Sequence, residues 1–239
     1  MTLRAVVFDL GDTLIRLRAL PSFGPVVHQH LHKTGLAQEG LDAQSLLADL
    51  RTAAAALDAG REAVYESMLC DLMLDRGVAQ PGAHARALAR VFDLGDVERF
   101  EAPPGLSASM AQFRAAGLKL AIVSNTTTSP ALLRAYLESV GITPHIDAAV
   151  FSVEHGYRKP SPSIYHAALD ALGVAPSEAL FTGDRVREDV AGPMSAGMRA
   201  ALMHRFRQET PPGDLAAPVV RSLDELRVVV ARLNSSSGE

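Results

Sequence analysis

The 239 residues, 48% of them hydrophobic, are enough to bury the core of one domain and of a second, smaller one. The formal net charge is −4 and the basic residues are scattered, so no basic stripe is present to neutralise a nucleic acid, and we expect no nucleic-acid partner. The apolar runs fall short of a secretory h-region and of the ~20 residues of a membrane span, which predicts a cytoplasmic protein without a membrane partner.

The first predicted element is a strand. The run Ala5–Phe8 is apolar throughout, rich in β-branched and aromatic residues, and stops at a turn that begins with Asp9. A short apolar run without polar alternation is typical of a strand buried on both faces. We therefore expect residues 5–8 to form the central strand of a parallel sheet.

The next stretch, from about Pro21 to Glu101, has a different pattern. It is rich in Ala and Leu, helical in period and almost free of strand-like runs. We interpret it as an inserted helical cap over residues 19–101, with the core formed by residues 1–18 and 102–234. Residues 235–239 are predicted to be a flexible tail.

After residue 104, apolar runs alternate with amphipathic helices, which is the pattern of βαβ units. Two of the helices start at a Ser-Pro pair and end at a glycine, over residues 129–141 and 161–173. A last helix opens with a capping box of Ser222 and Glu225. The expected strands are Leu118–Val123, Ala148–Ser152, Ala179–Thr182 and Ala200–His204. The predicted fold class is a doubly wound α/β fold with a parallel sheet and an inserted helical cap.

Polar residues follow the predicted strands where each strand ends. In an open parallel sheet, ligands bind at the carboxyl ends of the strands, so these side chains are expected to face one place. They supply a carboxylate nucleophile, a hydroxyl, an ammonium group and a second acidic pair, which together can hold a hard cation against a phosphate. The residues are Asp9, Ser124, Asn125, Lys159, Asp184 and Asp189.

With these residues in place, the sequence resembles the haloacid dehalogenase superfamily of phosphohydrolases. The four motifs of that superfamily match, in order and spacing, Phe8–Leu14, Ile122–Ser124, Arg158–Pro160 and Gly183–Asp189. The resemblance covers the whole core, and the helical insert matches the position of the superfamily's mobile cap. It implies a Rossmann-like core and a phosphatase that acts on the phosphoric monoester of a small phosphorylated metabolite.

The resemblance also implies roles for individual residues. Asp9 would attack phosphorus and form an aspartyl-phosphate, while Ser124 and Lys159 would hold the phosphate oxygens, with Asn125 as a further substrate-binding residue. A carboxylate nucleophile divides hydrolysis into two easier steps, and positive charge around the equatorial oxygens stabilises the transferring group. The catalytic residues expected on this basis are Asp9, Ser124 and Lys159.

The cofactor implied by the resemblance is Mg²⁺. Its ligands would be Asp9, Asp184 and the backbone carbonyl of Gly11, with Asp189 supporting the site. Oxygen ligands of this kind are those that Mg²⁺ prefers in proteins.

The first motif departs from the superfamily at one position. Members with phosphatase activity usually have an aspartate two residues after the nucleophile, as general acid, and this chain has Gly11, followed by Asp12 where a glycine is usual. A general acid contributes ~10²–10⁴-fold, so its loss would slow esters of poorly acidic alcohols most and acyl or anomeric phosphates least. Asp12 would need a local backbone change to replace it.

Two other functions remain as alternatives. Gly11 favours a binding or regulatory protein that is catalytically weak, and the pair Ser124-Asn125 is also found in 2-haloacid dehalogenases. The segment from Gly183 to Asp189 has the metal-binding, phosphatase-like form, which makes dehalogenation the weaker interpretation.

Each candidate residue also has a purely structural interpretation. Asp9 would be a strand-end turn residue, Ser124 a turn hydroxyl and Lys159 a solvated side chain, while acids such as Asp184 and Asp189 commonly complement a helix dipole. Because all these residues are expected at the same edge of the sheet, the functional interpretation is favoured.

The cap offers only weak candidates. His28 and His32 are four residues apart on a predicted helix, but they lack an acidic or thiolate partner nearby, so we expect them to be solvated or packed within the cap. Arg61, Tyr65 and Arg76 are candidates for contact with the substrate.

Overall fold

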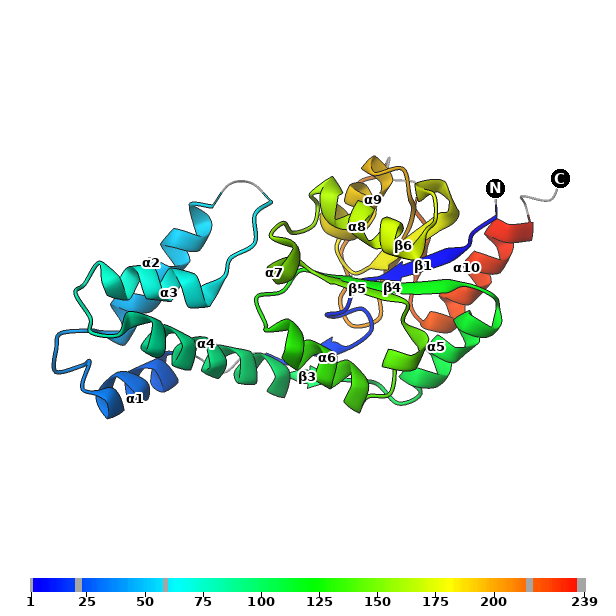
Figure 1. The fold of residues 1–239 in the computed structure, drawn as a ribbon. Coiled ribbons are helices and arrows are strands. Elements are labelled where there is room, and N and C mark those ends of the chain that lie inside the picture. The colour runs from blue at the N-terminus through cyan, green and yellow to red at the C-terminus, as the bar shows by residue number, and fades with distance from the viewer. Residues whose placement is uncertain (1, 20–22, 58–59, 214–216, 236–239) are drawn as a thin grey trace.

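The computed structural model describes residues 2–19, 23–57, 60–213 and 217–235. A core built around one sheet carries a helical insert at one end, and the two are joined by short extended segments (Figure 1). The predicted tail at 235–239 lies almost wholly outside the described residues, and Ser235 is the last residue of the C-terminal helix.

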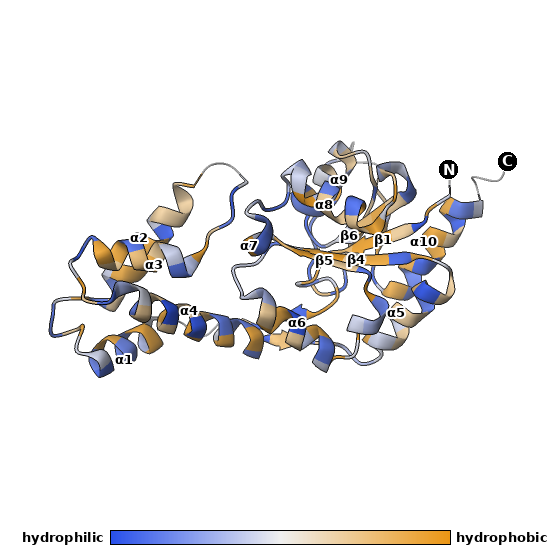
Figure 2. Cartoon of the chain, viewed as in Figure 1, coloured by the Kyte–Doolittle hydropathy of each residue, from blue (hydrophilic) through white to orange (hydrophobic). Residues whose placement is uncertain are grey.

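The sheet of the core has six strands in the order β5-β4-β1-β6-β7-β8, and all pairs are parallel. Strand β1 lies between β4 and β6, with Ala5 opposite both Lys119 and Ala179. All four residues of β1 are buried, which confirms the prediction of a central strand. Figure 2 shows the sheet as a mostly hydrophobic layer. The strands are β1 (Ala5–Phe8), β4 (Lys119–Ser124), β5 (Ala148–Phe151), β6 (Ala179–Gly183), β7 (Arg199–Met203) and β8 (Val219–Val220).

Helices cover both faces of this sheet, as a doubly wound fold requires (Figure 1). Because successive side chains of a strand point to opposite faces, Val6 and Phe8 pack into one apolar cluster while Ala5 and Val7 pack into another. The first cluster includes residues of α5 (Leu106–Ala115), α6 (Pro130–Ser139) and α10 (Leu223–Ser235). The second includes residues of α8 (Pro162–Leu172) and of the turn that follows α9 (Gly192–Ser195). The predicted fold class is confirmed.

The predicted strands and helices are displaced by at most one or two residues, and some short elements escape prediction. Strand β8 is only two residues long, and the fourth motif contains a π-helix, η3 (Val186–Ala191). Other short helices are η1 (Thr143–His145), α7 (Ser152–His155) and η2 (Pro176–Glu178). Patterns of period 2 or 3.6 need more residues than these elements contain.

The predicted helix starts are correct in position but only partly in mechanism. Helices α6 and α8 begin at Pro130 and Pro162, yet the preceding serines make no side-chain cap hydrogen bond. At α10 the Ser222 hydroxyl accepts from the Glu225 amide at 3.1 Å, and the Glu225 carboxylate accepts from the Arg221 amide.

The insert forms its own layer of helices beside the core. It consists of α1 (Gly24–Thr34), α2 (Ala43–Ala55), α3 (Tyr65–Leu74) and α4 (Pro81–Glu98), all within the segment 19–101. Buried residues from all four helices make a separate apolar cluster, so the insert does not depend on the sheet for its core. Two short strands, β2 (Arg16–Leu17) and β3 (Phe100–Glu101), pair antiparallel where the chain enters and leaves the insert. Sequence patterns do not reveal strands this short.

The insert's core supplies a stability test. Leu88 is fully buried on α4, whereas Leu94 on the same helix is 45% exposed. We expect Leu88→Ala to lower the free energy of unfolding by about 2–5 kcal/mol, because the truncation leaves a cavity. Leu94→Ala should change it by less than about 0.5 kcal/mol. Urea unfolding followed by circular dichroism measures both, and equal effects would contradict the separate core of the insert.

Candidate active site

The carboxyl edge of the sheet brings the predicted site residues together. Asp9 directly follows β1, Ser124 ends β4 and Asp184 follows β6, while Lys159 precedes α8 and Asp189 lies in η3. All five are buried, each with at most 7% of its surface exposed. A cavity of about 420 Å³ opens at this edge, and Asp9, Ser124, Lys159 and Asp184 line it. This volume is in the range of sites for small molecules.

Lys159 is the charged centre of this cluster. Its ammonium group donates to Asp9 Oδ1 and to Asp189 Oδ1, each at 2.7 Å, and only 2% of its side chain is exposed. Burial by itself would lower the pKa of Lys159, but the negative charges of Asp189 and Asp9 outweigh it and raise that pKa. The group therefore stays protonated, as holding a phosphate oxygen requires.

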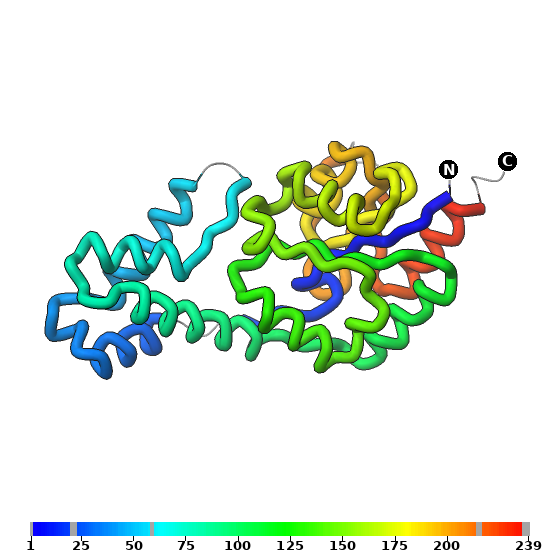
Figure 3. The backbone as a smooth tube through the Cα atoms, in the orientation of Figure 1, coloured from blue at the N-terminus to red at the C-terminus, as the bar shows by residue number. Residues whose placement is uncertain are grey.

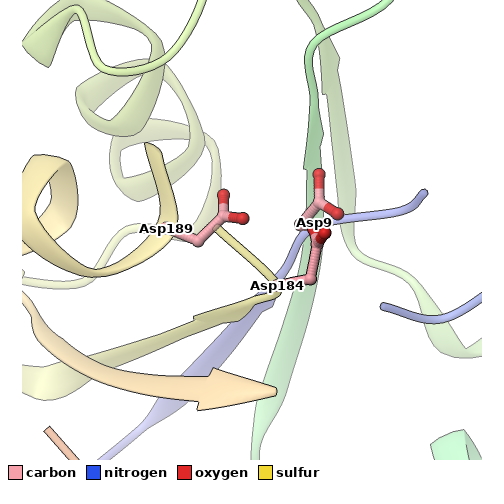
Figure 4. A group of neighbouring side chains, drawn as sticks. All are labelled: Asp9, Asp184 and Asp189. Carbon is pink, nitrogen blue, oxygen red and sulfur yellow. The ribbon is translucent and has the colours of Figure 1, made fainter. Parts of the chain in front are cut away.

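Asp9, Asp184 and Asp189 each offer one carboxylate oxygen, and these three oxygens lie within 4.8 Å of one another. Figure 4 shows the three side chains gathered from β1, from the end of β6 and from the adjoining helical segment. Burial first, and repulsion between the carboxylates second, raise the pKa of Asp184 to about 7. Burial likewise raises the pKa of Asp189 to about 6. Crowded, buried oxygens with raised pKa values suit a hard divalent cation such as Mg²⁺.

The local backbone explains how Asp189 reaches this cluster. Its Oδ2 accepts from the Arg185 amide at 3.0 Å, which folds the chain back at the start of η3. A side chain at Gly183 would place its Cβ 2.3 Å from Asp189 Cγ, so this position must be glycine if Asp189 is to keep its place. The glycine of the fourth motif thus makes room for an acid six residues later.

Asn125 lines the cavity and also fixes the position of Lys159. Its Oδ1 accepts from the Lys159 amide at 2.7 Å, and its Nδ2 donates to the Lys159 carbonyl at 3.0 Å. Both polar ends of the side chain therefore bind the backbone of Lys159, in the third motif and 34 residues away. Substrate binding by Asn125 remains a prediction, whereas its contacts tie Lys159 to the end of β4.

The turn after Asp9 is held by β2. Asp12 has a φ of 54°, and its Oδ1 accepts from the Leu17 amide at 3.0 Å. A Cβ added at Gly11 would lie 2.7 Å from Leu17 Cδ1, so the Leu17 side chain takes the space beside Gly11. Gly11 and Asp12 both line the cavity, but the Asp12 carboxylate is engaged in the turn.

The far wall of the cavity belongs to the insert and the segments that join it to the core. Of the three cap residues predicted as candidates, only Tyr65 lines the cavity. Arg61 lies over the ring of Tyr157, and Arg76 pairs with Asp49 on the surface. Sequence patterns did not single out the other lining residues of this wall, which are Phe23, Glu62, Phe92, Asp96, Arg99 and Phe100.

His28 and His32 lie on α1 and do not line the cavity. Their rings are 4.3 Å apart and both residues are exposed, in agreement with the expectation that they are solvated. Within the described residues, no helix combines the length and the apolarity that crossing a membrane would need.

Two known proteins are similar to this chain in sequence. The chain is 37% identical over 148 residues to a phosphoserine phosphatase of Thermus thermophilus, a match covering 62% of this chain but only 57% of that protein. It is 30% identical to a phosphoglycolate phosphatase of Rhodospirillum rubrum, covering 91% and 86% of the two chains.

Solved structures extend the likeness to the whole fold. A 2-haloacid dehalogenase from Pseudomonas syringae pv. Tomato DC3000 superposes with a TM-score of 0.78 over 97% of this chain and 100% of that one, at 21% identity, which shows a common fold. The model of the haloacid dehalogenase-like hydrolase family matches residues 3–197, the range that holds all four motifs and the insert. The chain therefore belongs to the haloacid dehalogenase-like hydrolase family.

Proposed function

We propose that this protein is a Mg²⁺-dependent phosphatase that hydrolyses the phosphoric monoester of a small phosphorylated metabolite through an aspartyl-phosphate on Asp9. One observation carries the proposal. The Asp9 carboxylate, buried at the carboxyl end of β1, lies against the Lys159 ammonium group and beside two further carboxylates. The cavity that it lines has the size of a small molecule. The relatives named phosphoserine phosphatase and phosphoglycolate phosphatase support the same activity.

The reaction follows from what these groups can do. An Asp9 carboxylate oxygen forms a bond to phosphorus as the bond from phosphorus to the ester oxygen breaks, and the leaving oxygen takes a proton from a water molecule. Water then attacks the same phosphorus, which releases phosphate and frees Asp9. Lys159 and Ser124 hold the equatorial oxygens, where negative charge must be stabilised.

Asp9, Asp184 and the carbonyl of Gly11, with Asp189 in support, would hold Mg²⁺. The ion would supply the charge that screens the phosphate from the carboxylates. The three crowded side-chain carboxylates fit this role because they offer only hard oxygen ligands.

The lining of the cavity supports one substrate class. Arg99 and Arg158 lie 3.8 Å from Asp96 and 3.7 Å from Glu62, and either guanidinium can also pair with a carboxylate on the substrate, in keeping with the phosphorylated carboxylic acids named for the two relatives. Because Gly11 supplies no general acid, we expect the best substrates to have acidic leaving groups, such as acyl phosphates. Assays with phosphoserine, phosphoglycolate, acetyl phosphate and para-nitrophenyl phosphate separate these classes. Absence of turnover with all four would favour the catalytically weak binding protein.

The first prediction concerns the nucleophile. Asp9→Asn should lower turnover by a factor on the order of 10⁴ or more, because the amide is isosteric but cannot attack phosphorus. Binding of inorganic phosphate and the circular dichroism spectrum should change little. Asp170→Asn, at an exposed position on α8, is the matched control and should retain full activity. Turnover of Asp9→Asn within tenfold of the parent would exclude Asp9 as nucleophile.

The second prediction concerns the metal. Asp184→Asn removes one charged oxygen ligand from the carboxylate cluster, so half-maximal activity should require a higher Mg²⁺ concentration. His28→Asn and His32→Asn, on the exposed face of α1, should leave the Mg²⁺ titration unchanged. An Asp184→Asn enzyme with the parent's Mg²⁺ dependence would remove Asp184 from the metal site.

The third prediction concerns the missing general acid. Gly11→Asp should speed the hydrolysis of alkyl phosphates relative to acetyl phosphate, by less than the ~10²-fold lower bound for a positioned acid, because the Leu17 side chain must first move. Gly11→Asn adds the same bulk without a proton to give, and should slow both substrates. If Asp12→Asn in the parent instead slows alkyl esters selectively, Asp12 is the acid.

A further inference from the structure

The insert contacts the core at a second place, away from β2 and β3. The chain returns toward the core after α2, and residues 60–64 lie beside the segment that follows α7 (Figure 3). Glu62 donates its amide to the Gly156 carbonyl at 3.0 Å, and Arg158 donates its amide to the Gly60 carbonyl at 2.6 Å. This short antiparallel pairing ends one residue before Lys159.

Glu62 is the part of this contact that enters the core. Only 1% of its side chain is exposed, although it belongs to the insert. Its Oε2 accepts from the Ser152 hydroxyl at 2.5 Å, and its Oε1 accepts from the Ala63 amide at 2.9 Å. A buried carboxylate that loses such partners is costly, so this site favours the insert in its docked position.

Ser152 connects Glu62 to the loop that follows Ser124. Its hydroxyl oxygen accepts from the Thr126 amide at 2.8 Å while its proton goes to Glu62. The Thr126 carbonyl also lies 3.2 Å from the Ser152 hydroxyl, so Ser152 contacts both backbone polar groups of Thr126.

Helix α4 holds the other half of the same loop. The Thr128 hydroxyl donates to Asp96 at 3.0 Å, and the Ser129 amide donates to Asp93 at 2.9 Å. Three acids of the insert thus bind one loop, directly or through Ser152. The loop begins with Asn125, whose side chain fixes the backbone of Lys159.

We propose that Glu62 is a positioning residue, which on docking of the insert orders the loop 125–129 through Ser152 and thereby sets Asn125 and Lys159 for reaction. The proposal rests on the proposed phosphatase function only for its kinetic consequence. Its structural consequence, an ordered loop, is measurable without any substrate.

The test is amide hydrogen exchange of the full chain, followed by mass spectrometry on peptides that cover residues 124–129. Glu62→Gln leaves one acceptor oxygen where the carboxylate offers two, and Glu62→Asp keeps the charge but is one methylene shorter. Both variants should raise exchange of the loop by roughly 10- to 100-fold, the effect of losing one hydrogen bond to a charged group. Asp49→Asn, which loses a surface pair with Arg76 elsewhere in the insert, should leave it unchanged.

A double-mutant cycle completes the test. If Glu62 acts through Ser152, Glu62→Gln should add little to the effect of Ser152→Ala on exchange and on kcat for acetyl phosphate. Unchanged exchange in both Glu62 variants, or fully additive effects, would overturn the proposal. A parent without phosphatase activity whose loop still responds would refute the proposed function and leave this inference standing.

Discussion

The burial of charge at the carboxyl edge of the sheet is the constraint on which the rest of the site depends. Three carboxylates and the Lys159 ammonium group share one small volume with almost no contact with water. The partly exposed Arg207 guanidinium also lies 3.7 Å from Asp184 Oδ2. Burial first, and repulsion between the carboxylates second, nevertheless raise the pKa values of Asp184 and Asp189 to about 7 and about 6. A divalent cation bound to the cluster would add two positive charges, which would lower its repulsion of a phosphate dianion.

This constraint explains why so many hydrogen bonds surround Lys159. A buried ammonium group without partners would be costly in free energy. The backbone of Lys159 must therefore be held where its side chain reaches Asp9 and Asp189. Asn125 holds its backbone from β4, and Asp189 is in turn held by the Arg185 amide. Lys159 is thus held by residues that directly follow β1 and β4 and by one residue of η3.

The insert has its own apolar core and also contacts the active-site loop. Its separate apolar core lets it keep its shape independently of the sheet, while its acids reach the loop after Ser124. If Glu62 has the proposed role, docking of the insert orders the loop after Ser124 and thereby positions Lys159. Closure that excludes water strengthens every electrostatic interaction inside such a cavity.

Much of this protein was determined by its sequence alone. The apolar run at β1, the alternation of strands and helices after residue 104 and the polar residues at the strand ends predicted the sheet and the residues that meet at its edge, because strand ends of a parallel sheet lie together. Tertiary structure decided the rest: Asn125 meets Lys159, Leu17 meets Gly11, and Glu62 meets Ser152 only through the fold. These contacts join residues that are far apart in the chain or in turns without periodicity, so no local pattern encodes them.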